Sequence, residues 1–485
     1  MLQNKDTNKI WELKSTFVNN HKNQKFFHRI IGLLKIQKHH AIFSSVKEKG
    51  ISVLQLISIL LTFPFIGQKN VYGFTRSFWN KYAEHGKDAY YRLKNNPRLN
   101  WRGFLFAVLK RTLSTLSERE VLKGHRLKSI KAFIFDDTSL GKTGKYIEGI
   151  SKIWDHVKKI HILGFQLLVM GLYDGTMFLP VNFSLHREKG KNRNKPYGLK
   201  NKELRKQFRK KRASKTHGAK RKKELDQSKI KSMIKMIKSA VKKGFKANYV
   251  LTDSWFTCWE TVKTTLECQM HYIGMFSKVK TKFLFNNKEL TYKEIRRINR
   301  KKTKKNRRFN LYYNRMVVQW NGQKVVLYAI RKGKNGKWKY IISTDLSLNF
   351  TQTIEIYQIR WSIEVFFKES KQLLDLGKCQ SQDFDAQIAD ITLTMIQYIF
   401  LALQNSIEKY ETLGKLFEQT QKYSLELRLH QRLVALLIAI IELIEDLFEQ
   451  ADYSEVFQKV IYDEKAQKKL LSLTNFELEK ATLAA

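Results

Sequence analysis

A short segment in the first third of the chain, FIFDDTSLGKTGK (133–145), offers two kinds of chemistry. Its Gly-Lys-Thr tail is similar to the end of a phosphate-binding loop. Such a loop needs a glycine five positions earlier, so that backbone N–H groups can wrap the phosphate. That position holds Asp136, whose carboxylate would repel a phosphate. The segment therefore does not predict a nucleotide loop, and the remaining interpretation is a metal site at the Asp136-Asp137 pair.

Two later segments supply further acids for the same kind of site. The strand-like segment ANYVLTDSWF reaches a carboxylate at Asp253. In YQIRWSIEVFFKESK, one helix face carries a phenol, a guanidinium, a carboxylate and an ammonium within about 60°, at about 100° per residue. These residues are Tyr357, Arg360, Glu364 and Lys371. Because hard cations take carboxylate oxygens, and Arg and Lys grip phosphates, the pattern predicts a metal site that acts on DNA.

The elements that must position these residues follow from the hydrophobic pattern. From residue 131, three consecutive strands are predicted, followed by an amphipathic helix and the strand that reaches Asp253. The strands are 131–139, 162–175 and 177–186, and the helix is 227–245. Residues 1–125 have helical spacing, 270–345 are rich in strand patterns, and the helical pattern returns from about residue 354. The apolar segment 51–67 is short for a bilayer and contains Gln55 and Pro64, so it predicts a buried helix.

The charge is large and unevenly distributed. The 485 residues carry a net charge of +48, with 91 Lys and Arg against 43 Asp and Glu. Residues 381–485 are acidic, with 10 basic and 17 acidic residues, so the excess lies in the first 380. The run 189–223 holds 17 Lys and Arg and one acid, and predicts an exposed loop with some helix that binds phosphates. A Lys-rich composition alone would spread the charge, so the pattern favours a nucleic-acid partner over a nonspecifically basic surface.

The cysteines and the amino terminus bear on cellular location. Three cysteines form no CxxC pair and no Cys/His zinc spacing, which predicts neither a disulfide framework nor a structural metal. The first 14 residues lack the apolar run of a signal peptide. We therefore expect a reducing cytosol and no membrane association.

The spacing Tyr-x2-Arg-x3-Glu-x6-Lys resembles the YREK signature of DDE transposases of the insertion-sequence-4 family, and all four positions match. DDTS and LTDSWF are similar to the first and second acid motifs of that family. The segment TDLSLNFTQTIEIYQIRWSIEVFFKESKQLL resembles the region around its third. The resemblance runs from about residue 131 to 400 in the right order. It implies a cut-and-paste DNA transposase that cleaves at terminal inverted repeats and then joins the freed 3′-OH to target DNA.

Carried onto this chain, the resemblance implies that Asp136, Asp253 and Glu364 are the catalytic, metal-binding triad. It implies two Mg²⁺ ions, with Mn²⁺ able to substitute. First motifs in the family usually read Asp-x-Thr, which selects Asp136 over Asp137. Strand alternation puts these two side chains on opposite faces, so only one should point at the metal.

The resemblance also implies DNA contacts. The tyrosine, arginine and lysine of the YREK face should contact DNA near the cleaved end. A tryptophan of the insertion stacks on a flipped base in relatives, and Trp320 and Trp338 are the candidates here, although each also fits a packed strand position. Lys142, in the basic turn after the first strand, is close enough to the acids to touch DNA.

The fold implied is α/β: an RNase H-like core with a β-rich insertion, flanked by helical regions. The expected division is a basic helical DNA-binding region (1–125), the first core part with the basic run (126–265), the insertion (266–345), the second core part with the Glu helix (346–400), and an acidic helical region for dimerisation (401–485).

The expected partners are transposon-end and target double-stranded DNA and a second copy of the chain, in a bacterial cytoplasm at the nucleoid. One alternative is a domesticated or inactive descendant that binds DNA without cutting it. The other is a basic DNA-binding regulator without chemistry, which would leave the three acids and their order unexplained.

Overall fold

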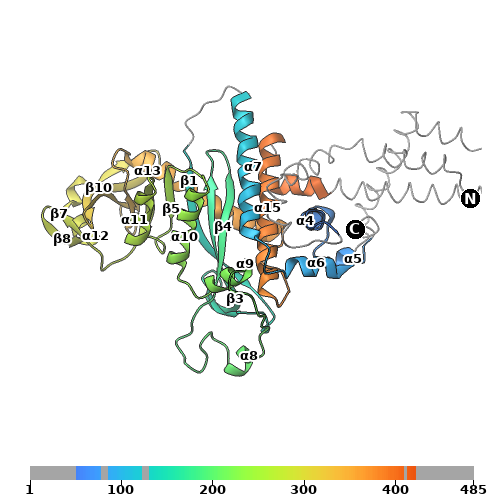
Figure 1. Cartoon of the computed structure of the whole chain (residues 1–485). Coiled ribbons are helices and arrows are strands. Elements are labelled where there is room, and N and C mark those ends of the chain that lie inside the picture. Colours follow the sequence, from blue (N-terminus) through green and yellow to red (C-terminus); the bar gives the residue numbers. More distant parts are fainter. Residues whose placement is uncertain (1–50, 78–85, 123–129, 409–411, 422–485) are drawn as a thin grey trace, which may run out of the picture. The chain divides into compact units, whose positions relative to one another are not determined.

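The computed structural model describes residues 51–77, 86–122, 130–408 and 412–421, which fall into two compact units (Figure 1). Of the described residues, the larger unit holds 51–56, 86–122 and 130–403, and the smaller holds 57–77, 404–408 and 412–421. Residues 1–50, 78–85 and 123–125 of the predicted helical, basic amino-terminal region lie outside the described residues, as does most of the predicted acidic region 401–485.

The smaller unit contains the apolar segment that was predicted to be a buried helix. Helix α4 (Val53–Thr62), which begins in the larger unit, continues as the 3-10 turn η1 (Phe63–Ile66). Pro64 stands in the first turn of η1, where a missing N–H costs nothing. Phe63 stacks on Phe74 of α5 (Val71–Thr75), with ring centroids 4.8 Å apart. The buried-helix prediction for this segment is confirmed.

A mixed sheet of twelve strands, counted over the described residues, organises the larger unit. Five strands in the order β4-β3-β1-β5-β6 form its first half. They are β1 (Ala132–Gly141), β3 (Ile160–Tyr173), β4 (Phe178–His186), β5 (Tyr249–Thr252) and β6 (His271–Phe276). The three hydrophobic strands predicted in succession are antiparallel neighbours, whereas β1, β5 and β6 run parallel. Strand β2 (Ser151–Asp155), paired with β3, was not predicted because its five residues are too few for a clear alternation.

The β-rich segment predicted around 266–345 is present, and its strands extend the same sheet. The sheet continues from β6 as β12-β11-β10-β7-β8, with β9 paired to β10. These strands are β7 (Lys282–Phe285), β8 (Lys288–Thr291), β9 (Lys304–Asn306), β10 (Leu311–Trp320), β11 (Gln323–Lys332) and β12 (Lys339–Ser343). Helix α12 (Tyr292–Ile298) and the turn η3 (Arg300–Lys302) connect β8 to β9. The continuous backbone pairing makes this segment an extension of the central sheet.

Helices cover the first half of the sheet. The helices α7 (Trp101–Leu122), α9 (His217–Glu224) and α10 (Lys229–Lys242) pack against β4, and α14 (Ser362–Leu373) packs against β1 and β4 (Figure 1). Helix α10 confirms its prediction: Ser228 caps its first turn, and Met233, Met236, Ile237 and Ala240 are buried at helical spacing. The remaining helices of this unit are α6 (Lys87–Lys94), α8 (Asn201–Arg205), α11 (Trp259–Glu267), α13 (Phe350–Gln358) and α15 (Phe384–Glu408).

Helix α15 is a buried core helix. Its segment Phe384–Ser406 is the one helix in the described part of the chain that is long and apolar enough to cross a membrane. However, 94% of the most apolar 18-residue stretch of this helix is buried inside the protein. Its apolar side chains are therefore accounted for by packing.

Candidate active site

Two of the predicted acids lie close together on neighbouring strands, Asp136 within β1, which continues to Gly141, and Asp253 directly after the end of β5. The register of β1 and β5 pairs Ile134 with Leu251. Asp136 and Asp253 each stand two residues further along, so they lie at the same level although 117 positions separate them in sequence. Asp253 begins the loop after β5, where its Oδ1 accepts the backbone N–H of Trp255 at 2.9 Å. The two carboxylates are near neighbours as predicted, but the prediction that Asp136 ends its strand was wrong, because antiparallel pairing with β3 carries β1 on to Gly141.

Arg360 connects the third acid to this pair. Its Nη1 lies 3.1 Å from Asp136 Oδ2, and its Nη2 lies 2.5 Å from Glu364 Oε1. Its guanidinium is also 5.9 Å from the ring centroid of Tyr357. The arginine, glutamate and tyrosine of the YREK spacing therefore gather beside Asp136.

The single helix predicted to carry the YREK face is interrupted. Helix α13 ends at Gln358, the 3-10 turn η4 (Ile359–Trp361) follows, and α14 begins at Ser362. The assumption of a constant 100° per residue from Tyr357 to Lys371 was therefore wrong. A 3-10 turn has about three residues per turn, which changes the direction of Arg360 relative to an unbroken α-helix. The turn places Arg360 where it can contact both β1 and α14.

The lysine of the YREK spacing contacts the first strand further along. Lys371 Nζ donates to Thr138 Oγ1 at 2.6 Å and to the carbonyl oxygen of Ser139 at 3.3 Å. Burial lowers the pKa of Lys371. Thr138 and Asp136 are two positions apart on β1, so their side chains share a face of the strand. All four YREK residues thus lie along that face.

The acids are held at an electrostatic cost. Burial raises the pKa of Asp136 to about 7; the nearby charge of Asp253 adds to the rise, while the backbone N–H of Asp137 and the Arg360 guanidinium oppose it. Burial likewise raises the pKa of Asp253, and the charge of Asp137 contributes to that rise. Desolvated, neighbouring carboxylates disfavour each other's ionised form. A cation at this point would relieve the repulsion.

Asp137 has a different partner from Asp136. Its Oδ2 forms a 2.6 Å ion pair with Lys229 Nζ at the start of α10. The same ammonium lies 4.5 Å from the ring centroid of Trp255. Strand alternation therefore turns Asp136 toward η4 and α14, and Asp137 toward α10. This arrangement supports choosing Asp136 as the first acid.

The side chains that could bind a metal ion at this site are the carboxylates of Asp136, Asp253 and Glu364. Among the described residues, no three His, Cys, Asp or Glu side chains gather closely enough to hold one. Arg360 stands between Asp136 and Glu364, and its single positive charge only partly balances the two carboxylates. The three acids offer only carboxylate oxygens, which suits hard cations such as Mg²⁺ and not the nitrogen and sulfur chemistry of zinc. The acids therefore suit a hard divalent cation in chemical type, but their spacing in this structure does not gather them around one.

Three side chains predicted to contact DNA are placed differently from that expectation. Trp320 is 4% exposed and packs against Phe283, so neither of its faces is free for a base. Trp338 is half-buried, with the guanidinium of Arg331 4.6 Å from its ring centroid and that of Arg296 at 5.0 Å.

Lys142 is likewise buried. It is 9% exposed, and its Nζ donates to the carbonyl oxygens of Gly377 and Cys379, so it ties the end of β1 to the loop after α14. The local spacing that suggested a DNA contact did not reveal this buried position.

Two tryptophans near the acids were not selected from the sequence. Trp255 follows Asp253 by two residues and is 50% exposed. Trp361 follows Arg360 directly and is 62% exposed, the highest value among the exposed tryptophans of the described residues. Large exposed aromatic side chains beside a polar site are typical of base-stacking surfaces. Their position next to the motif residues was visible in the sequence, but their exposure was not.

The basic run 189–223 has both buried and exposed cations. Arg212 is 5% exposed at its side chain and forms ion pairs with three acids: Glu148 at 2.6 Å, Asp383 at 3.2 Å and Asp385 at 2.9 Å. Lys210 lies 2.7 Å from Asp383 and 3.0 Å from Asp385. We refer to these five residues as the Arg212 cluster. The run was predicted to be an exposed, phosphate-binding loop with some helix; helices α8 and α9 are present in it, but the predicted exposure was wrong for this part of the run.

Comparison with known families shows which family the chain belongs to. The family model described as DDE superfamily endonuclease matches residues 56–306, just over half of the 485 residues. No curated protein matches the chain. The matched segment includes Asp136 and Asp253 and ends before Glu364. Because this match covers more than half of the chain, the chain belongs to the DDE superfamily endonucleases.

Proposed function

We propose that this protein is a DNA transposase similar to those of the insertion-sequence-4 family, which binds terminal inverted repeats, cleaves them and transfers the strand. The observation that carries the proposal is the bridge from Asp136 through Arg360 to Glu364, at the level where Asp253 leaves β5. A regulator without chemistry would have no need for desolvated acids at this point. The family membership supports a nuclease or transposase in general terms.

The sheet supports an RNase H-like core. In the order β4-β3-β1-β5-β6, three antiparallel strands are followed by two parallel ones. The first acid lies on the central strand and the second at the end of its parallel neighbour. The strands from β7 to β12 would then be the insertion between the second and third acids, extending the sheet beyond β6.

The roles of the residues follow from their contacts. Asp136, Asp253 and Glu364 would hold divalent cations, which DDE superfamily endonucleases typically use. When bound, such cations activate water or a 3′-OH and stabilise the charge that develops on the phosphodiester. Mg²⁺ is the expected ion and Mn²⁺ a workable replacement. Arg360 would orient Glu364 and offer its guanidinium to a DNA phosphate.

Other residues of the site would position DNA. Burial raises the pKa of Tyr357 to about 12, so its phenol stays protonated and can donate a hydrogen bond. Lys371 would hold the β1 backbone and a phosphate beyond it. The exposed rings of Trp255 and Trp361 would stack on unpaired bases near the cut, in place of Trp320 and Trp338.

The wider partners are double-stranded DNA and a second copy of the chain. The net charge of +48, concentrated in the first 380 residues, favours association with DNA backbone. A bacterial cytoplasm with nucleoid association is the matching location. Dimerisation through the acidic carboxy-terminal region would leave the basic surface free for DNA.

The test begins with the DNA that flanks the gene. Short inverted repeats bordered by a direct duplication would define the ends, and a duplex that contains one end becomes the substrate. We expect Mg²⁺-dependent nicking at the repeat boundary by the full chain, measured on a denaturing gel. Binding to the repeats without any cleavage in Mg²⁺ or Mn²⁺ would contradict the proposal and favour a domesticated DNA-binding descendant.

A further inference from the structure

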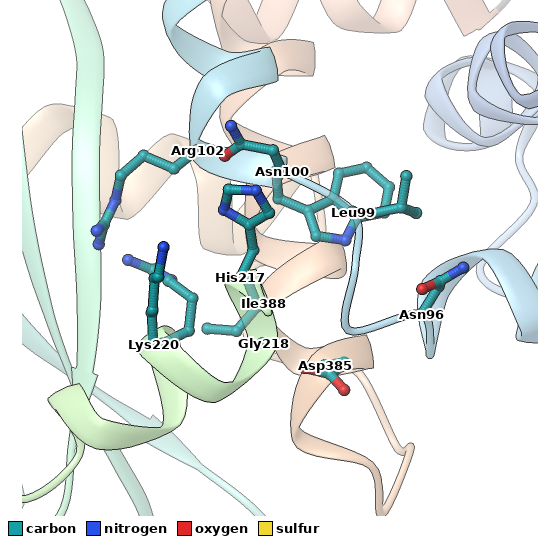
Figure 2. Close-up of a pocket in the computed structure, with 11 residues that line it drawn as sticks. Asn96, Leu99, Asn100, Arg102, His217, Gly218, Lys220, Asp385 and Ile388 are labelled. Carbon is teal, nitrogen blue, oxygen red and sulfur yellow. The ribbon is translucent and has the colours of Figure 1, made fainter. Parts of the chain in front are cut away.

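A small cavity lies between α7, α9 and the start of α15, all in the larger unit. Its volume is about 70 Å³, and Asn96, Asn100, His217 and Lys220 are among the residues that line it (Figure 2). Cavities for drug-sized ligands are about 300–1,000 Å³, so a nucleotide or base does not fit. The cavity has room for a few waters or one small ion.

Its lining consists largely of hydrogen-bond donors. The Asn100 Oδ1 accepts the backbone N–H of Gly103 at 2.9 Å, and the Asn96 Oδ1 accepts that of Arg98 at 2.9 Å. With both amide oxygens engaged, the NH₂ groups remain as the hydrogen-bonding ends of these side chains. Figure 2 shows both asparagines around the pocket with His217. The polar edge of the cavity is therefore built to donate.

Buried donors without acceptors lie in the wall of the same cavity. Trp101 is 3% exposed and its Nε1 has no hydrogen-bond partner among the described residues. Arg221 is 6% exposed, and its Nε and Nη2 also lack a partner there. Buried polar groups in native proteins are nearly always satisfied by protein, water or ion. Their presence in this wall points to an acceptor that binds close by.

The charge around the cavity is positive. Arg102 and Arg221 share a single carboxylate, Glu224, at 2.9 Å each. Lys220 is exposed and adds a further cation. The lining acid, Asp385, already has Arg212 and Lys210 as partners in the Arg212 cluster. A carboxylate-poor cavity with excess cations attracts anions.

We propose that this pocket binds one tetrahedral oxyanion, a phosphate, through Asn96, Asn100, His217 and Lys220. The phosphate would lie at a distance along the chain from the acids of the active site and would be a positioning contact, not a reacting group. A phosphate in the DNA backbone and free inorganic phosphate offer the same chemistry. The two sources are separated by experiment.

The first arm uses inorganic phosphate and the full-length chain. Burial, together with the charges of Lys220 and Arg102, lowers the pKa of His217, and a bound anion would raise it again. We expect the His217 ring signal, identified by its loss in His217→Asn, to titrate at higher pH in phosphate than in chloride of equal ionic strength. Lys220→Gln should weaken phosphate binding about tenfold, as expected for one lost charge-assisted hydrogen bond.

The matched control is Lys223→Gln, which removes the same charge from the same helix. Lys223 is exposed and does not line the cavity. We expect its phosphate affinity to equal that of the unmodified chain. An equal response of Lys220→Gln and Lys223→Gln would mean that only bulk charge matters, and would overturn the proposal.

The second arm replaces phosphate with a DNA duplex. If a backbone phosphate enters the pocket, Lys220→Gln should reduce the salt dependence of DNA binding by about one unit of slope, and Lys223→Gln should not. A response to inorganic phosphate alone would assign the pocket to the free ion. If neither phosphate nor DNA changes the His217 titration, the proposal is wrong. None of these readouts uses DNA cleavage, so they are independent of the proposed transposase activity.

Discussion

Two groups of three carboxylates in the larger unit meet their cations in different ways. At the candidate active site, one guanidinium, Arg360, contacts two of the three acids, and burial raises the pKa of Asp136 to about 7. In the Arg212 cluster, two cations contact three acids through short ion pairs. Its partners, led by the Arg212 hydrogen bond, outweigh burial and lower the pKa of Glu148, although burial raises that of Asp385.

The difference separates a site prepared for a ligand from a structural connection. The acids of the active site lack sufficient positive charge, so a divalent cation would gain from binding there. The Arg212 cluster is nearly fully buried and compensated, and it joins the basic run to the start of α15. A group of acids therefore does not by itself indicate a catalytic site, and the degree of charge compensation is what distinguishes these two groups.

The largest expected effect is on cleavage. Asp253→Asn and Glu364→Gln should each reduce the cleavage rate by about 10³-fold or more, the order seen when a central catalytic group is removed. The asparagine keeps an oxygen for the N–H of Trp255, so the loop after β5 should persist. Cleavage of an end-containing duplex in Mg²⁺, with DNA affinity measured in parallel, checks both effects. Near-normal cleavage by either variant would remove that residue from the triad.

The choice of the first acid is tested by a matched pair of neighbours. Asp136→Asn should be inactive, because Asp136 contacts Arg360 and lies level with Asp253. Asp137→Asn should only impair cleavage, because Asp137 pairs with Lys229 on the other face. The same cleavage assay compares them. An inactive Asp137→Asn beside an active Asp136→Asn would reverse the assignment.

Removing the central cation of the second group should affect stability instead. Arg212→Met leaves three buried acids with reduced compensation and should lower the free energy of unfolding by about 3–5 kcal/mol. Chemical denaturation measures the loss. Arg209→Met, at an exposed position of the same run, is the control and should change stability little. Equal stabilities of the two variants would contradict the structural role of the cluster.

Asp136 and Glu148, one acid from each group, should give opposite pH dependences of stability. The folded pKa of Asp136 is raised to about 7 from 3.8, so without metal its contribution falls as pH rises from about 4 to 7. The folded pKa of Glu148 is lowered, so its contribution is present above about 4.5 and is lost as pH falls below it.

Unfolding measured in EDTA from pH 4 to 8 separates the two contributions. Asp136→Asn should flatten the decline in the free energy of unfolding between about pH 4 and 7. At pH 8 it should raise this free energy by on the order of 1–3 kcal/mol. If Asp136→Asn kept the full decline in the free energy of unfolding, a group other than Asp136 would be its cause.

The smallest effect should come from the exposed cations of the basic run. Lys206, Arg209 and Lys211 are exposed, and their joint replacement by Gln should reduce the salt slope of DNA binding by up to about three units, equally for specific and random DNA. Cleavage once bound should be unchanged, whereas Arg360→Gln should impair it. If the triple variant instead lost cleavage at saturating DNA, the run would belong to the site.

Part of this molecule followed from local sequence. Short runs rich in Ile, Val and Phe predicted β1, β3, β4 and β5, and helical spacing predicted α10, because period and turn residues act over a few positions. The same runs correctly put Asp253 at the end of β5, whereas Asp136, also predicted at a strand end, lies within β1. The YREK spacing identified Arg360, Glu364 and Lys371, all of which lie beside β1 or its first acid.

Tertiary structure decided the rest, because burial and partner choice depend on residues far apart in sequence. The sequence offered Lys142 and Trp320 as possible DNA contacts. In the fold, Lys142 is hydrogen-bonded to the loop after α14, and Trp320 packs against the Phe283 ring. The fold divides the cations of the run 189–223 into buried and exposed sets. Glu148, which precedes β2, and Asp385, in the first turn of α15, both form ion pairs with the buried Arg212. The 3-10 turn η4 and helix α14 both contact β1, and a constant helical period in the sequence does not predict such a break. Composition determined how much charge the chain carries, and the fold determined which of those charges remain free to act.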